Sequence, residues 1–445
     1  MMHPINVAEK SDVGFARIPE GETDVRPGFV GFTTRGFLAA VICVATLAAA
    51  SAQTPPAPIV VDGPAHQAPW VRYRDWSQTT WPTYNTLSER TRTPVATGKP
   101  IDIVGEIAGD PKKGQDLAFA RSRGGGCLAC HVMGPASQET PGNAGPDLSE
   151  IGSAGRPDSY LYNYIHDPRH LNAASSMPPW GAHGFYNDEE IRHMVAFLKT
   201  LKTPARFRSA LDDPEKRPKP VEDRDALDPF VNPAVDRIDA GRALFAKAGP
   251  GGKSCVSCHA DEKKFAGWAV TMPRWEPRMK KMLGVEEFIF RHASATTGED
   301  YRMQSTGNTD LSVFLHSLSN GLPINVDISS ADAKPVYDLG KTLFETKIGQ
   351  FNFSCGDCHD PNRGGNKWLR GQFVGESKGQ LDHFPLWRTS RGAGQVWDVR
   401  KRLQWCNVQV RADVLPPDVP EYDALELYLK AQSQGYKLTA PNIRH

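Results

Sequence analysis

The sequence predicts an all-α, loop-rich protein of three small domains joined by linkers. The main observation is an internal repeat. One cassette occurs at 114–131, 241–259 and 340–359, and each copy begins with a glycine and ends in C-x-x-C-H. Between them lie leucine and phenylalanine at helical spacing and then a loop. Each cassette is therefore predicted to be a short helix that leads into the same attachment motif.

The second observation is that a longer amphipathic segment follows each cassette after a loop-rich stretch. Apolar residues recur in these segments with the three-to-four-residue period of a helix. The segments are 189–202, 309–324 and 420–435. With 40 glycines and 36 prolines, the 445-residue chain favours loops over long regular elements, and it is long enough for two or three domains.

The motif C-x-x-C-H is typical of covalent c-type haem attachment, in which two thiols bond the haem and the histidine binds its iron. A redox C-x-x-C does not require the histidine, and a zinc site would need a second cysteine pair at structural-zinc spacing, which the sequence lacks. We therefore expect three cytochrome c-like haem domains and three covalently bound haem c groups. The expected attachment residues are Cys127, Cys130, Cys255, Cys258, Cys355 and Cys358, and the expected proximal iron ligands are His131, His259 and His359.

Each haem iron has a second axial position, whose occupant tunes its reduction potential. Met177 is predicted to fill it in the first domain, because it lies 46 residues after His131 in a proline-rigid loop that precedes the closing helix. The alternative is core filling, which is the role expected of Met194. For the second haem His292, Met303 and Met272 are candidates, and His292 could instead be a surface histidine.

Cys406 is the candidate for the third haem. It lies 47 residues after His359, which nearly repeats the interval from His131 to Met177. A thiolate ligand would stabilise ferric iron, and cationic neighbours favour the thiolate and attract a small oxyanion. These neighbours are Arg400, Lys401, Arg402 and Arg411. The alternative is a buried, inert thiol.

The N-terminal residues 1–52 are predicted to be a secretory signal peptide. Arg35 precedes the apolar run 37–50, which ends in a small-x-small cleavage pattern and is short for a membrane span. A membrane anchor is the alternative. Cleavage would remove Cys43, leave 53–104 as an N-terminal extension, and deliver a periplasmic protein without stable membrane insertion. The net charge of +1 gives no reason to expect nucleic acid as a partner.

The chain resembles two cytochrome families. Residues 105–203, with "CLACH", "GPDLSEIG" and "MPPWG", look like SoxX, a monohaem cytochrome c. The C-terminal half, with "GQFNFSCGDCHDPNRGGNKWLRGQ" and "RKRLQWCNVQVRA", resembles SoxA, and we divide it into a first haem domain, 233–327, and an active-site haem domain, 328–445. The stretch 204–232 is rich in proline and charge and is predicted to be a linker. The whole resembles a SoxXA-type cytochrome of the sulfur-oxidation system in which the two subunits are fused.

The resemblance implies an activity. SoxXA-type cytochromes couple thiosulfate oxidatively to a cysteine of the SoxYZ carrier protein in the periplasm, and two electrons pass to a small c-type cytochrome. In that family a cysteine that is often a persulfide ligates the active-site haem, and it matches Cys406, while Arg402 matches a basic site residue. The sulfur of Cys406 would carry the chemistry, with thiosulfate held by Arg402 and by Arg411 or Lys430.

Two positions depart from the SoxA pattern. His292, in "EFIFRHA", stands where the family usually has a cysteine ligand, which supports histidine ligation of the second haem. Near the end of the last helix the family has an anion-binding arginine, and this chain has only Lys430 and Gln432. Two other functions stay open: a multihaem electron-transfer cytochrome without sulfur chemistry, and a thiosulfate dehydrogenase that forms tetrathionate.

Overall fold

The computed structural model describes residues 84–87, 97–121, 126–134, 140–220, 226–388 and 394–443. The predicted signal peptide, 1–52, and most of the predicted extension, 53–104, lie outside these residues. Within them the chain is mainly helical, as predicted. Short strands, which the sequence analysis did not predict, lie in the C-terminal half.

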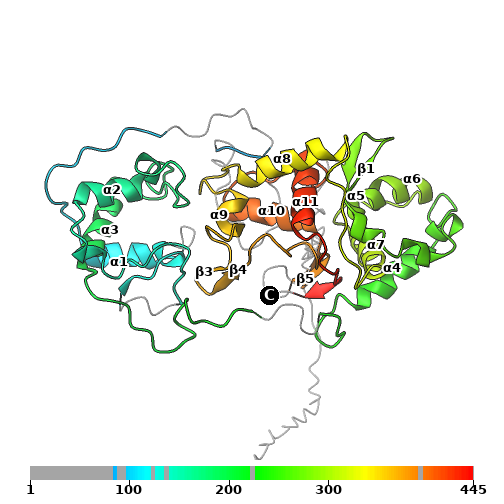
Figure 1. The fold of residues 1–445 in the computed structure, drawn as a ribbon, viewed down its shortest axis with the longest axis horizontal. Coiled ribbons are helices and arrows are strands. Elements are labelled where there is room, and N and C mark those ends of the chain that lie inside the picture. The colour runs from blue at the N-terminus through cyan, green and yellow to red at the C-terminus, as the bar shows by residue number, and fades with distance from the viewer. Residues whose placement is uncertain are drawn as a thin grey trace, which may run out of the picture. The chain divides into compact units, whose positions relative to one another are not determined.

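Three helix pairs repeat along the chain, and each joins a cassette helix to its closing helix (Figure 1). The pairs are α1 (Pro111–Phe119) with α3 (Asp188–Thr200), α4 (Asp236–Ala246) with α7 (Thr306–Ser317), and α8 (Ala333–Glu345) with α11 (Pro420–Gln432). The cassette glycine lies where the two helices cross. A β-carbon on Gly114, Gly241 or Gly340 would lie 2.0, 2.1 or 2.0 Å from a carbonyl oxygen of the facing helix, so only glycine permits this approach.

The remaining helices are short and carry the attachment motifs or pack beside them. They are α2 (Asp158–His166), α5 (Val285–Phe288), a π-helical turn (Ile289–Ala293), α6 (Ser294–Thr297), α9 (Cys355–His359) and α10 (Val399–Gln409). One-turn 3₁₀ helices include Cys127–Ala129 and Cys255–Ser257. All three attachment motifs therefore begin on a tight helical turn, which places both cysteines and the histidine on neighbouring positions.

The strands form two hairpins and one small sheet. The hairpins pair β1 (Arg274–Glu276) with β2 (Lys281–Leu283), and β3 (Lys367–Leu369) with β4 (Gln372–Val374). In the sheet β5 (Leu386–Arg388) lies between antiparallel β6 (Gln395–Trp397) and parallel β7 (Asn442–Ile443). The β5–β6 pair leads directly into α10 and so helps to set where that helix begins.

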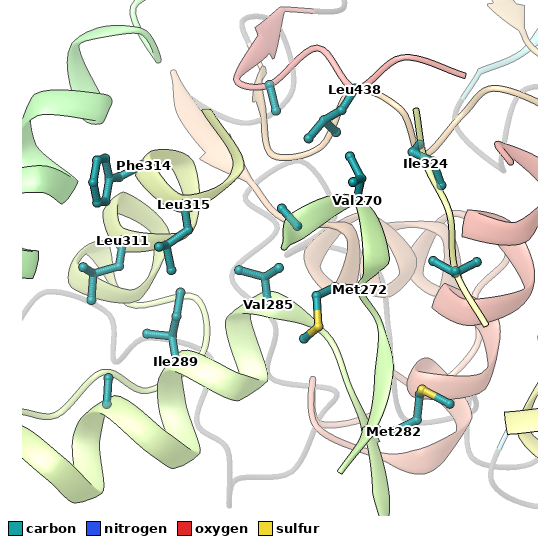
Figure 2. Packing of buried hydrophobic residues seen from close by; sticks show 14 of the residues in the cluster. Val270, Met272, Met282, Val285, Ile289, Leu311, Phe314, Leu315, Ile324 and Leu438 are labelled. Carbon is teal, nitrogen blue, oxygen red and sulfur yellow. The ribbon is translucent and has the colours of Figure 1, made fainter. Parts of the chain in front are cut away.

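Buried hydrophobic residues gather in three clusters, one around each helix pair. Figure 2 shows the cluster around α4 and α7, where Met272, Val285 and Phe314 pack together with Leu438 from the C-terminal segment. Phe351, which precedes the third motif, belongs to the cluster around α1 and α3. Side chains thus cross the predicted domain boundaries, which themselves stay a prediction.

Part of the predicted linker, 204–232, packs on the hairpin β3–β4 and its turn. The Arg217 guanidinium donates to the carbonyl oxygen of Arg370 at 2.8 Å and lies 4.6 Å from the ring centroid of Trp368. Lys219 lies over Phe373. These contacts fix part of the linker to the hairpin β3–β4. In the residues that the structure describes, no helix has the length and apolar character needed to cross a membrane.

Candidate active site

The first attachment motif borders a large cavity. The turn Cys127–Ala129 presents its cysteines to this cavity, and the backbone N–H of His131 donates to the carbonyl of Cys127 at 3.0 Å. His131 Nδ1 donates to the carbonyl oxygen of Pro146 at 2.7 Å, which leaves Nε2 as the nitrogen that can bind a metal. The cavity has a volume of about 1330 Å³, and Met177 forms part of its wall.

Met194 also borders this cavity, but it differs from Met177 in its setting. Met194 is buried on α3 among the hydrophobic residues of the first cluster. Met177 is half-buried in a loop, and its backbone N–H donates to Ser175 Oγ at 3.1 Å. The loop position leaves Met177 the freer of the two thioethers, and its role as an iron ligand stays a prediction.

The first motif offers its two cysteines and its histidine to a haem. Burial raises the pKa of Cys127 to about 12 and that of Cys130 to about 11. Among the described residues, no group of three or more histidines, cysteines or carboxylates is placed to share a metal ion. The cavity, the two motif cysteines and the oriented histidine fit a covalently bound haem.

The second motif faces a second histidine. The ring centroids of His259 and His292 are 6.3 Å apart. Metal–imidazole bonds are about 2 Å long and the bonded nitrogen lies roughly 1 Å from the ring centroid, so two imidazoles on one iron would be about 6 Å apart. The rings of Phe265 and Phe288 flank the pair, with centroids 5.1 Å from His259 and 5.3 Å from His292. This geometry fits a haem between the two histidines.

The alternative methionines lie in different surroundings. Met272 is 2% exposed and belongs to the hydrophobic cluster shown in Figure 2. Met303 is also buried, at 1% exposure. His292 lies on the π-helical turn Ile289–Ala293, a kind of turn that is frequent at functional sites. Burial, and then the nearby His259, lower the pKa of His292, which favours the neutral imidazole that binds iron.

The third motif brings Cys406 to its histidine. His359 Nδ1 donates to the carbonyl oxygen of Gly375 at 2.8 Å, and the Cys406 side chain is hydrogen-bonded to His359. Burial raises the pKa of the Cys406 thiol, but Arg402, His359 and Arg388 together hold it below its ordinary value. Burial also raises the pKa of Cys358 to about 12. Of these two sulfurs, Cys406 is the one whose surroundings favour the thiolate.

Two arginines act on Cys406, and one of them was missed in the sequence. Arg402 is half-buried on α10, and its Nη1 is buried without a hydrogen-bond partner in the described structure. Arg388 at the end of β5 is buried and contributes positive charge to the same sulfur. Arg388 lies 18 residues before Cys406, so only the β5–β6 pair and α10 bring them together.

The other predicted anion-binding residues lie in different surroundings. The Arg411 guanidinium lies 4.9 Å from the ring centroid of Phe185 and donates to Gln350 Oε1 at 2.9 Å. Lys430 is buried, and its Nζ donates to the carbonyl oxygen of Leu381 at 2.8 Å. These contacts give Arg411 and Lys430 structural partners, whereas the groups that lower the pKa of Cys406 are Arg402, His359 and Arg388.

Helix α10 is held by a buried network of charges. Arg400, which is fully buried, pairs with Asp423 at 2.8 Å and with Glu426, both on α11. Asp398 caps the helix by accepting from the backbone N–H of Lys401 at 2.6 Å. Because breaking a buried ion pair is costly, this network fixes the helix that presents Cys406.

Comparison with known families agrees with this architecture. Residues 240–324 match the model described as SoxA/TsdA, cytochrome c domain. Residues 110–198 match the model described as Cytochrome C oxidase, cbb3-type, subunit III. Both are cytochrome c domains, so covalent haem c is a property of this chain. The match to the second model covers the region that resembles SoxX.

Relatives with curated descriptions match the C-terminal half. The L-cysteine S-thiosulfotransferase subunit SoxA of Paracoccus pantotrophus is 30% identical over 220 residues, which are 49% of this chain and 73% of that protein. The SoxA subunit of Chlorobaculum thiosulfatiphilum is 30% identical over 207 residues, 46% of this chain and 70% of that protein. The crystal structure of SoxXA from P. pantotrophus covers 48% of this chain and 80% of its own at 27% identity, with a TM-score of 0.45.

Proposed function

Because this chain belongs to the SoxA family of SoxXA-type c-type cytochromes, we propose that it oxidatively conjugates thiosulfate to a cysteine of a SoxYZ-type carrier protein. The relatives named L-cysteine S-thiosulfotransferase support this class of reaction. The observation that carries the proposal is the pairing of Cys406 with His359, under the positive charge of Arg402 and Arg388. We place the reaction in the periplasm, on the basis of the predicted signal peptide.

The proposal assigns three haem c groups to the three attachment motifs. Met177, His292 and Cys406 would bind the irons of these groups together with His131, His259 and His359 respectively. When bound, each haem accepts and releases one electron at a time, so the set can take the two electrons of a sulfur–sulfur oxidation. The shared cavity supports transfer between the first and third groups, because Cys130 and Cys358 both border it.

The residues of this chain hold the reactants. Thiosulfate is received by Arg402, whose buried Nη1 is available to an anion, and the positive charge of Arg388 adds to the attraction. The Cys406 sulfur lies beside this site as the group where sulfur–sulfur chemistry occurs. Overall, thiosulfate and the carrier thiol form one S–S bond, one proton leaves the thiol, and two electrons pass to a small c-type cytochrome.

The test uses the purified chain with its haems, thiosulfate, an oxidised c-type cytochrome and the carrier protein. The mass of the carrier's cysteine peptide is followed for the wild type and for Cys406→Ala, after haem content shows that both are fully loaded. We expect a thiosulfate adduct with the wild type and none with the variant. An adduct that persists with Cys406→Ala overturns the role of this sulfur.

Two other outcomes of this experiment would identify the protein as one of the alternatives. If the wild type reduces the cytochrome with thiosulfate alone and forms tetrathionate, the chain is a thiosulfate dehydrogenase. If the carrier stays unmodified while electrons still pass between haems and cytochrome, the chain is an electron-transfer protein. A haem content of two per chain would contradict the assignment of haem to one of the motifs.

A further inference from the structure

The loop that carries Met177 is bonded to the third attachment motif. Ser176 Oγ donates to Asp357 Oδ1 at 2.7 Å, and Asp357 lies inside the motif, directly before Cys358. Lys347 Nζ donates to the carbonyl oxygen of Ser175 at 3.1 Å and to Asp357 Oδ2 at 2.6 Å. Two residues next to Met177 in the sequence are thus held by the part of the chain that carries the third haem site.

The Asp357 carboxylate is itself fixed in place. Its side chain is 1% exposed, and Oδ2 accepts from the backbone N–H of Ser354 at 2.8 Å and from the Ser354 hydroxyl at 3.1 Å. Arg363 Nη1 donates to Oδ1 at 3.4 Å. With these donors the carboxylate cannot follow a movement of Ser176. It acts as a rigid anchor for the loop.

The two sites joined by these bonds share one cavity. Its wall includes Met177 and Cys130 of the first site, and Asp357 and Cys358 of the third. The Ser176–Asp357 hydrogen bond is therefore a direct link between the segments that hold the two groups.

We propose that Asp357 and Lys347 are positioning residues that keep Met177 on the iron of the first haem and provide a bonded path for electrons from the third haem. The proposal rests on the proposed function, since it requires haem at both motifs and Met177 as a ligand. With haem bound at both motifs, this path would carry one electron at a time from the third site to the first, and no covalent bond would form or break. The small c-type cytochrome would be the final acceptor.

A thioether is a weak iron ligand on a mobile side chain, so its occupancy depends on how firmly its loop is held. Releasing Met177 requires the loop to move, and the charge-assisted bonds to Asp357 and Lys347 resist that movement. Loss of one such bond raises the population of the released state about tenfold. The change is visible without an activity assay, because an added imidazole binds the vacated iron position.

The test compares Ser176→Ala with Ser209→Ala in the fully loaded protein. Ser209 is the matched control, because its hydroxyl donates to Asp212 Oδ2 at 2.9 Å in the exposed linker, away from either site. We expect Ser176→Ala to weaken the far-red absorption band of methionine-ligated ferric haem and to raise imidazole affinity about tenfold. Electron transfer from the third to the first haem, followed after rapid reduction, should slow. Ser209→Ala should match the wild type in all three readouts.

Lys347→Gln is the second variant, and it should shift imidazole affinity in the same direction. If both variants keep wild-type band intensity, imidazole affinity and transfer rate, the proposal is overturned. A wild-type spectrum without the far-red band overturns it as well, because Met177 is then not the ligand. The carrier-adduct assay distinguishes that result from failure of the proposed function, since conjugation can proceed with another ligand on the first haem.

Discussion

The second and third attachment motifs arise from the same cassette but meet different partners. At the second motif Cys258 is exposed, and His259 faces the imidazole of His292. At the third motif His359 meets the sulfur of Cys406 under the charge of two arginines. The cassette thus determines how a haem would be attached, whereas the element that packs opposite the histidine determines which chemistry that haem could support.

The elements that bring the opposing residue into place also differ. His292 lies on a π-helical turn that follows α5, whose first turn begins after Gly284 and has no side-chain cap. Cys406 lies on α10, which Asp398 caps and which Arg400 ties to α11. A reactive sulfur must keep its position relative to the iron and the substrate, and a relay ligand has only to reach the iron. The stronger anchoring of α10 fits the first demand.

Replacing Cys406 or His292 by methionine should produce the largest difference between the two sites. We expect Cys406→Met to lower carrier conjugation by at least about 10³-fold, because no sulfur remains that can form or break an S–S bond. His292→Met should keep conjugation within about threefold while raising the potential of the second haem by on the order of 100 mV. The measurements are the mass of the carrier peptide and a spectroscopic redox titration. Equal losses in both variants would mean that the two sites do not differ in role.

Substitutions of Arg402 and Arg411, which the sequence analysis assigned to one anion site, should differ in their effect on thiosulfate turnover. Arg402→Gln removes a charge beside Cys406, and we expect kcat/KM for thiosulfate to fall about 10- to 100-fold. Arg411→Gln should stay within about threefold, because the Arg411 guanidinium contacts Phe185 and Gln350. Steady-state kinetics at saturating carrier would measure both. A larger loss of kcat/KM with Arg411→Gln would show that Arg411 belongs to the anion site.

The smallest effect concerns the cap of α10. Burial, with Glu286 adding to it, raises the pKa of Asp398 to about 7 from 3.8. The folded state thus holds a proton that the unfolded state has released, so stability should fall between about pH 4 and 7, by at most roughly 1.4 kcal/mol per pH unit. Asp398→Asn keeps a capping oxygen and removes this titration.

The urea midpoint of Asp398→Asn should therefore change less between pH 5 and 7 than that of the wild type. Asp300→Asn, which alters the exposed pair with Arg302, is the control and should keep the wild-type slope. If the urea midpoint changes equally with pH in Asp398→Asn and in the wild type, Asp398 is not the titrating group.

Much of the architecture was predictable because it repeats. The cassette glycines, the helical spacing of their apolar neighbours and the closing segments predicted three helix pairs, and three pairs are present. The closing helices begin within three residues of the predicted segments, since capping and periodicity are local properties, but α7 ends at Ser317 and not at the predicted 324. The resemblance to SoxXA-type cytochromes, which depended on short motifs, is confirmed by the relatives.

Features that depend on distant segments were not predictable. Arg388 reaches Cys406 through the pairing of β5 with β6, and no spacing in the sequence signals it. The position of Arg411 depends on Phe185, more than 200 residues earlier. Arg411 lies past the last turn of α10 with a left-handed φ of 55°, and its predicted place in the anion site stays a prediction.

The sequence by itself determined the attachment chemistry and the helical cassettes, because C-x-x-C-H and helix periodicity act over a few residues. Only the tertiary structure decided that His292 faces His259, that Arg388 acts on Cys406, and that Asp357 bonds Ser176 beside Met177. Those pairings join residues that are 18 to 181 positions apart. They follow from how helices and loops pack, and packing depends on the whole chain.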